Sequence, residues 1–135
     1  MKIGIGLPNQ IRDVSAALIP QWAARAEHAG FNTLATVGRT AYPGVMDTVA
    51  LAGAAAVTST IGLTSTVMLA TVWPPVLLAK ELASIDAMSG GRLVGMIQPT
   101  ESEETVLRPK LSQIGCAGRI VQRLGAALKR AHSPS

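Results

Sequence analysis

The sequence predicts an α/β fold with parallel strands, built from about four strand–helix units. Short apolar runs typical of strands begin near residues 2, 33, 61 and 92, so each unit takes about 30 residues. The intervening segments have apolar residues at helical spacing and are bounded by proline or glycine. A closed (β/α)8 barrel uses roughly 250 residues for eight units, so 135 residues correspond to half a barrel. Doubly wound sheets have units of similar length, and the period alone does not choose between them.

The composition indicates a globular chain with a hydrophobic core. Of the 135 residues, 48% are hydrophobic and 15% are charged, which excludes a disordered chain. We expect one domain over residues 1–135. Cys116 is the single cysteine, so an internal disulfide and a cysteine-rich metal site are excluded. We predict no metal site and a cytoplasmic location, because a lone thiol fits a reducing compartment.

The first unit is predicted as a strand over residues 2–7 and a helix over residues 20–29. Pro20 suits the first turn of a helix, and Gly30 suits the left-handed position that ends one. His28 falls on the polar face, which makes it a solvated residue rather than a ligand. The residues expected to face inward are Ile19, Trp22, Ala23, Ala26 and Ala29.

The second unit is predicted as a strand over residues 33–37 and an alanine-rich helix that ends at about Val57. Asp47 is a plausible N-cap for this helix because its carboxylate can accept from the free amides of the first turn.

The third unit combines a strand over residues 61–69 with a helix that begins at Pro74 and Pro75. Ser89, Gly90 and Gly91 are expected to end the helix, since glycine adopts the left-handed conformation of such a stop. Two groups of helix residues follow from the spacing: Leu78, Leu82 and Ile85 face inward, while Lys80, Ser84 and Asp86 point elsewhere.

The fourth unit is predicted as a strand over residues 92–97, a polar loop and a helix over residues 119–131. Arg92 can donate to nearby carbonyl groups at the start of the strand. Ile120, Leu124 and Leu128 are expected to face inward, and Arg119, Arg123 and Arg130 to form a charged outer face. Stacking aromatic residues do not accompany these arginines, so we expect no nucleic-acid partner.

An uncharged run of 32 residues, from Thr48 to Ala79, is longer than the stretch that spans a membrane. It contains eight Ser or Thr residues, Gly62 and a Pro–Pro pair. A buried helix followed by a buried parallel strand explains the run without a bilayer. We therefore expect no membrane partner and keep membrane insertion as an alternative.

Four segments resemble the luciferase-like monooxygenase family. They are KIGIGLPNQ, WAARAEHAGFNTL, DTVALAGAAAVTSTIGLTSTVML and, most specifically, PPVLLAKELASIDAMSGGRLV. The resemblance is strong over residues 1–95. Residues 96–135 form a divergent loop and final helix, in which the similarity to the family is weaker and is found at AGRIVQRLGAALKRA. Members of this bacterial-luciferase-like family are (β/α)8 barrels, so the resemblance implies a truncated barrel, of which this chain is the N-terminal half.

The resemblance also implies a function. Family members are oxidoreductases or monooxygenases that use reduced FMN or the deazaflavin coenzyme F-420 on small-molecule substrates. In the family the segment after the third strand packs against the flavin or deazaflavin ring, so the resemblance assigns cofactor contacts to Met68, Leu69, Ala70 and Thr71. It assigns no catalytic residue and no particular substrate. Core packing is the alternative role for Met68 and Leu69.

Substrate-binding candidates follow from the geometry of a parallel barrel, in which the reactive end is formed by the loops after the strands. Asn9, Arg39 and Gln98 follow the first, second and fourth strands. The alternative for Asn9 and Gln98 is a role within a turn. Gly38 departs from the family, many of whose members have an acidic residue after the second strand.

A second hypothesis of a different class is a non-catalytic half barrel that acts as a self-associating or partner-binding remnant. An open four-stranded parallel sheet leaves two edge strands with unpaired backbone groups and an apolar inner face. Pairing of two copies would cover both, so we expect a homo-oligomer.

Overall fold

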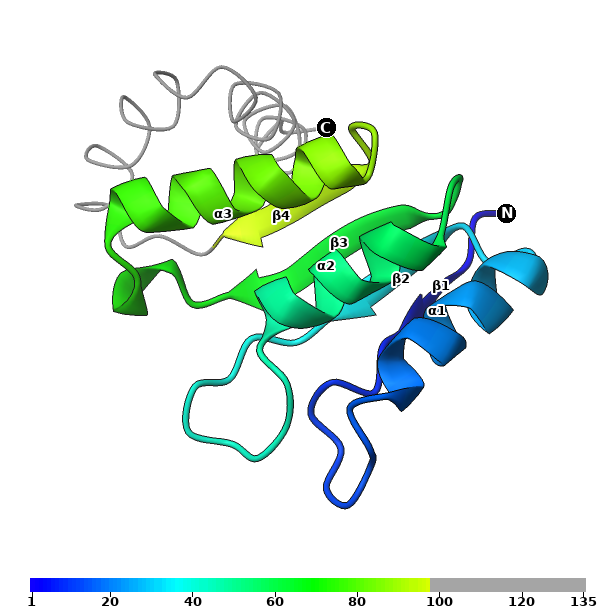
Figure 1. The fold of residues 1–135 in the computed structure, drawn as a ribbon, viewed down its shortest axis with the longest axis horizontal. Coiled ribbons are helices and arrows are strands. Elements are labelled where there is room, and N and C mark those ends of the chain that lie inside the picture. Colours follow the sequence, from blue (N-terminus) through cyan, green and yellow to red (C-terminus); the bar gives the residue numbers. More distant parts are fainter. Residues whose placement is uncertain (98–135) are drawn as a thin grey trace, which may run out of the picture.

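The fold is a parallel four-stranded sheet with helices along one face (Figure 1). The computed structural model describes residues 1–97. Predictions that concern later residues, namely Gln98, Cys116, the helix over 119–131 and a single domain over 1–135, lie outside this part of the chain. The elements are β1 Gly4–Gly6, α1 Leu18–His28, β2 Thr33–Thr36, α2 Asp47–Val57, β3 Gly62–Met68, the short 3-10 helix η1 Ala70–Val72, α3 Pro75–Met88 and β4 Leu93–Ile97.

The topology distinguishes a barrel-type sheet from a doubly wound one. The strands are hydrogen-bonded in the order β1-β2-β3-β4, and all three pairings are parallel. The helices α1, α2 and α3 lie side by side on one face (Figure 1). A strand order that never reverses places every right-handed crossover on the same side, whereas a doubly wound sheet has a switch point and helices on both faces. The α/β class predicted from the sequence is confirmed.

The core lies between the sheet and these helices. Register places Leu34 opposite Leu63 and Leu63 opposite Leu93, so one row of buried leucines crosses three strands. Ala23 of α1, Leu51 of α2 and Leu82 of α3 belong to the same buried cluster. Because strand side chains alternate between faces, each residue next to such a leucine points to the face without helices.

Helix α1 begins two residues before the predicted start and has a narrower apolar face than predicted. Ile19, Ala23 and Ala26 are buried, but Trp22 is 37% exposed and Ala29 is exposed, so both predicted inward positions are corrected. The indole N–H of Trp22 donates to the carbonyl oxygen of Gly6 at 3.1 Å. Since β1 is an edge strand, this bond holds the indole at the rim of the sheet instead of in the core. His28 is exposed, as predicted.

Helix α2 ends at Val57, as predicted, but its N-cap is Met46 instead of Asp47. Asp47 is the first residue of the helix, and its carboxylate accepts from a first-turn amide, that of Thr48, as predicted. Only the assigned cap position was wrong; the second carboxylate oxygen bonds to Ser65 of β3, which the local sequence does not reveal.

Helix α3 has the predicted buried residues Leu78, Leu82 and Ile85. Asp86 is also buried, which corrects the prediction that it points away from the core. Its Oδ1 accepts from the backbone N–H of Leu93 at 3.4 Å, because the end of α3 lies beside the start of β4. Gly90 and Gly91 have φ values of +67° and +85°, which confirms the predicted left-handed stop.

Two charged side chains hold the end of the sheet at which the strands begin. Arg92 donates to the carbonyl oxygens of Ser89, Ile61 and Thr58 at 2.6, 2.7 and 2.7 Å, which confirms the predicted carbonyl contacts. The Glu27 carboxylate accepts from the backbone amides of Ser59, Thr60 and Ile61. Desolvation raises the pKa of Glu27, but the hydrogen bonds from this loop outweigh it and lower the pKa to about 2.

Among the helices of residues 1–97, none has both the length and the apolar character needed to cross a membrane.

Candidate functional site

The candidate site lies at the carboxyl ends of β1, β2 and β3. We call residues 7–17, between β1 and α1, the first loop, and residues 37–46, between β2 and α2, the second loop. Figure 1 shows these loops, in blue and cyan, projecting from the same end of the sheet. The third connection is η1, which follows β3 directly. In parallel α/β folds, ligands bind at this end of the strands.

Asn9 fastens the first loop to the second. Its Nδ2 donates to the carbonyl oxygens of Val37 and Val45 at 3.0 and 3.2 Å, and its Oδ1 accepts from the Val37 amide at 3.3 Å. The backbone amide of Val45 donates to the Asn9 carbonyl oxygen at 2.8 Å. Asn9 is 1% exposed, so its amide serves the junction of the two loops. Substrate contact by Asn9 stays a prediction.

Gly38 lets the second loop pass close to β3. A Cβ atom at this position would lie 2.7 Å from the carbonyl oxygen of Val67 and 3.1 Å from Oδ2 of Asp47. Side chains do not tolerate a contact of 2.7 Å with backbone, so any residue other than glycine would push the loop away from the sheet. The departure from an acidic residue noted in the sequence therefore has a steric explanation in this structure.

Asp47 is a buried carboxylate that sequence analysis treated only as a helix cap. It is 2% exposed, and its Oδ1 accepts from the Thr48 amide at 3.0 Å while its Oδ2 accepts from the Ser65 hydroxyl at 3.1 Å. These bonds join the start of α2 to the middle of β3, just below the second loop.

The sequences of β2 and β3 contain an indication of this buried polar site. Ser65 follows the buried Leu63 by two positions, and Thr36 follows the buried Leu34 by two, so both face the helices. Register places Thr36 opposite Ser65. Polar residues at apolar strand positions indicate a buried hydrogen-bonding partner. For Ser65 this partner is Asp47, whereas the buried Oγ1 of Thr36 has no hydrogen-bond partner among residues 1–97.

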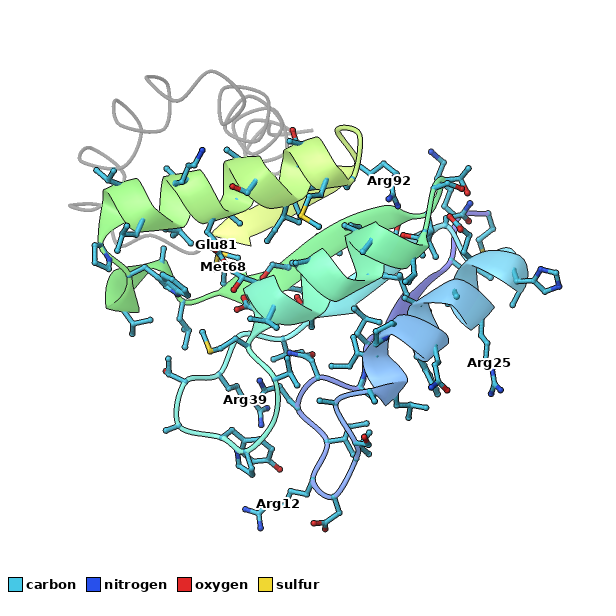
Figure 2. The ribbon with its side chains drawn as sticks, in the orientation of Figure 1. Arg12, Arg25, Arg39, Met68, Glu81 and Arg92 are labelled. Atoms are coloured by element: carbon cyan, nitrogen blue, oxygen red, sulfur yellow. The ribbon has the colours of Figure 1, made fainter. Side chains whose placement is uncertain are left out.

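The segment after β3 divides into buried and exposed residues. Met68 and Ala70 are buried in the core, and Figure 2 shows Met68 between the sheet and α3. Leu69 is 40% exposed. Thr71 is the central residue of η1. If this segment contacts a ring, Leu69 would offer side-chain surface, whereas Met68 and Ala70 would offer backbone.

Arg39 lies on the second loop and is exposed. Its guanidinium carbon lies 5.2 Å from the centroid of the Tyr42 ring, and that of Arg12 in the first loop lies 5.5 Å from the same centroid. Figure 2 shows both arginines at the end of the molecule formed by the two loops. The sequence predicts a role for Arg39 but not for Arg12 or Tyr42, because nothing local indicates that the two loops meet.

Within residues 1–97, no group of three or more His, Cys, Asp or Glu side chains is arranged to hold a metal ion. The surface that the two loops and η1 present is apolar at Leu69 and cationic at Arg12 and Arg39. Such a surface can bind and orient a ligand that has both an apolar and an anionic part.

The model of the luciferase-like monooxygenase family matches residues 1–103. The chain belongs to this family. The search of curated proteins gave no match.

Solved structures of luciferase-like enzymes share the fold. Monooxygenase RslO1 from Streptomyces bottropensis is 27% identical, with a TM-score of 0.64 and coverage of 87% of this chain and 41% of that one. The coenzyme F-420 dependent tetrahydromethanopterin reductase from Methanopyrus kandleri is 25% identical, with a TM-score of 0.62 and coverage of 80% and 30%. The oxygenating constituent of 3,6-diketocamphane monooxygenase from Pseudomonas putida, in complex with FMN, is 17% identical, with a TM-score of 0.65 and coverage of 79% and 32%.

These luciferase-like neighbours are TIM-barrel enzymes, and the match covers less than half of each. The four described strands with their alternating helices therefore correspond to part of a (β/α)8 barrel.

Proposed function

We propose that this luciferase-like chain binds reduced FMN or coenzyme F-420 and takes part in the oxidation or reduction of a small-molecule substrate. The family match over residues 1–103 is the observation that carries the proposal. The proposed cofactor contacts are Met68, Leu69, Ala70 and Thr71, and the proposed substrate contacts are Asn9, Arg39 and Gln98. A cytoplasmic homo-oligomer is part of the same proposal.

The described residues fit a planar ring. Register aligns Gly6, Ala35, Thr64 and Val94 across all four strands, on the face without helices. These side chains are small, and each is exposed or half-buried. A row of small side chains lets a flat group approach the sheet closely. Leu69 adds apolar surface at the carboxyl end of β3.

When bound, the reduced cofactor supplies the hydride or the reactivity toward oxygen. The protein's contribution is placement: Leu69 packs against the ring, the buried Met68 and Ala70 fix the turn that holds Leu69, and Arg39 orients an anionic group of the substrate. In this proposal the described residues orient the reactants and transfer no proton.

Titration of the purified 135-residue chain with FMN and with coenzyme F-420, followed by fluorescence, tests the proposal. We expect saturable binding that Leu69→Ser weakens about fivefold to tenfold, because about 1 kcal/mol or more of apolar contact with the ring is lost. Val57→Ser is the matched control, since Val57 is an exposed apolar residue at the far end of α2, outside the site. Absence of binding at high micromolar cofactor contradicts the proposal.

A second candidate is a non-catalytic, self-associating chain. Three exposed apolar side chains, Val72, Val76 and Leu77, lie close together in sequence at η1 and the start of α3. Exposed apolar patches of this kind mark protein–protein contacts. Under this candidate, light scattering would find a dimer or larger assembly that Leu77→Ser dissociates, with no cofactor binding by the chain.

A further inference from the structure

The loops at the carboxyl ends of β1 and β2 bring two positive charges to one aromatic ring. Arg12 comes from the first loop and Arg39 from the second, yet both guanidinium carbons lie within 5.5 Å of the centroid of Tyr42. Two cations repel each other, and each exposed cation–π contact contributes only about 0.5–1 kcal/mol. This pair is therefore a place where an anion would add stability.

The contact with Tyr42 leaves the hydrogen-bond donors of both guanidinium groups available. A ring attracts a guanidinium through its charge and uses none of its five N–H groups as a conventional donor. Within residues 1–97, neither Arg12 nor Arg39 donates a side-chain hydrogen bond or lies in a salt bridge. The two loops contain one acidic residue, Asp13, against these two arginines.

The supporting loops are fastened at their bases before any ligand binds. Asn9 joins the loops through the carbonyl oxygens of Val37 and Val45, and Gln10 Nε2 adds a bond to Val45 at 3.2 Å. Gly38 keeps the second loop against β3. A preorganised pair of donors loses less conformational entropy on binding than two free surface arginines would.

We propose that Arg12 and Arg39, held on Tyr42, form a binding site for an oxyanion of the substrate. The shared chemistry is two or more oxygens that accept from the outward N–H groups of the two guanidinium groups, as a carboxylate or a phosphate does. The assignment to a substrate rests on the proposed function, because Gly38, the residue before Arg39, lies against the backbone of Leu69. Arg12 and Tyr42 are specificity-determining residues in this proposal.

The test is an NMR titration of the full chain with inorganic phosphate and, separately, with malonate, at constant ionic strength. We expect saturable shifts of backbone amides in the first and second loops. Arg12→Gln and Arg39→Gln should each weaken binding about tenfold, which corresponds to the loss of charge-assisted hydrogen bonds. Tyr42→Leu should weaken it as well, whereas Tyr42→Phe, which keeps the ring, should not.

Arg25→Gln is the matched control. It removes the same charge from an exposed position on α1, which Figure 2 shows away from Arg12 and Arg39. Its affinity should stay within about twofold of the wild type, since exposed charges interact weakly through water. Thermal unfolding of each variant reports whether it is folded.

Saturation by phosphate alone identifies a phosphorylated ligand, and saturation by malonate alone identifies a carboxylate. The proposal is overturned if neither anion saturates, or if Arg25→Gln weakens binding as much as the loop variants do. A parallel titration with riboflavin, which has the ring but no phosphate, tests cofactor-ring binding separately. Absence of binding by both riboflavin and coenzyme F-420, with retained anion binding, contradicts the cofactor proposal only. Binding of either ring without saturation by an anion contradicts the anion site only.

Discussion

The two ends of the sheet use charged side chains in opposite ways. At the end where the strands begin, Glu27 and Arg92 turn onto the backbone and bond to the amides and carbonyls of residues 58–61. At the end where the strands finish, the neutral amide of Asn9 joins the loops, and Arg12 and Arg39 remain on the surface. The end where the strands begin therefore stabilises the fold, and the end where they finish is suited to ligands. This division is typical of parallel barrels.

The largest effect is expected from Arg92→Met. This change keeps an apolar stem but leaves the carbonyl oxygens of Ser89, Ile61 and Thr58 without their donor. Loss of several charge-assisted hydrogen bonds at a half-buried site should lower the free energy of unfolding by about 2–4 kcal/mol. Urea denaturation measures the loss. Arg25→Met, at an exposed position of α1, should stay within about 0.5 kcal/mol of the wild type; equal losses in both variants would show that Arg92 has no special role.

The second-largest change in the free energy of unfolding is expected at the opposite end of the sheet. Asn9→Leu removes the three side-chain bonds that Asn9 makes to the second loop and should lower the free energy of unfolding by about 1–3 kcal/mol. Because the loops lose their junction, affinity for phosphate or malonate should also fall. Gln10→Met, which removes only one bond to a carbonyl that Asn9 also serves, should change stability by less than about 1 kcal/mol. Weakened stability with unchanged anion affinity would separate Asn9 from the site.

The smallest effect concerns Glu27 and depends on pH. Its pKa is lowered to about 2 in the folded chain, so its carboxylate contributes stability that is fully present above its unfolded pKa of about 4.3 and disappears as the pH falls through about 2. Glu27→Gln should lower the free energy of unfolding by about 1 kcal/mol at neutral pH. The difference between the two proteins should shrink below about pH 4. Denaturation curves between pH 7 and pH 2 measure it, and a constant difference over that range would exclude the carboxylate as the cause.

Most of the fold could be predicted from neighbouring residues. The alternation of short β-branched runs with alanine-rich and leucine-rich helical patterns located all four strands and three helices of the described chain. Gly90 and Gly91 marked the end of α3, because few other residues adopt the left-handed conformation found there.

The errors in the fold arose where distant segments meet. Trp22 was expected in the core, but an edge strand offers it the carbonyl of Gly6. Asp86 was expected outside, but the start of β4 supplies a donor to it. Asp47 was expected at the N-cap of its helix, but it is the first helical residue, and one of its carboxylate oxygens bonds to Ser65 of β3.

The sequence by itself determined the order of the elements, the parallel α/β class and the family, because these follow from local polarity, chain stiffness and short motifs. It also placed Arg39 and residues 68–71 after the ends of strands. Only the tertiary structure decided that Leu69 is exposed while Met68 is buried, and that Arg12 shares Tyr42 with Arg39. Such contacts depend on how two loops, separated by a complete helix and strand, are held together, which here rests on the hydrogen bonds of Asn9.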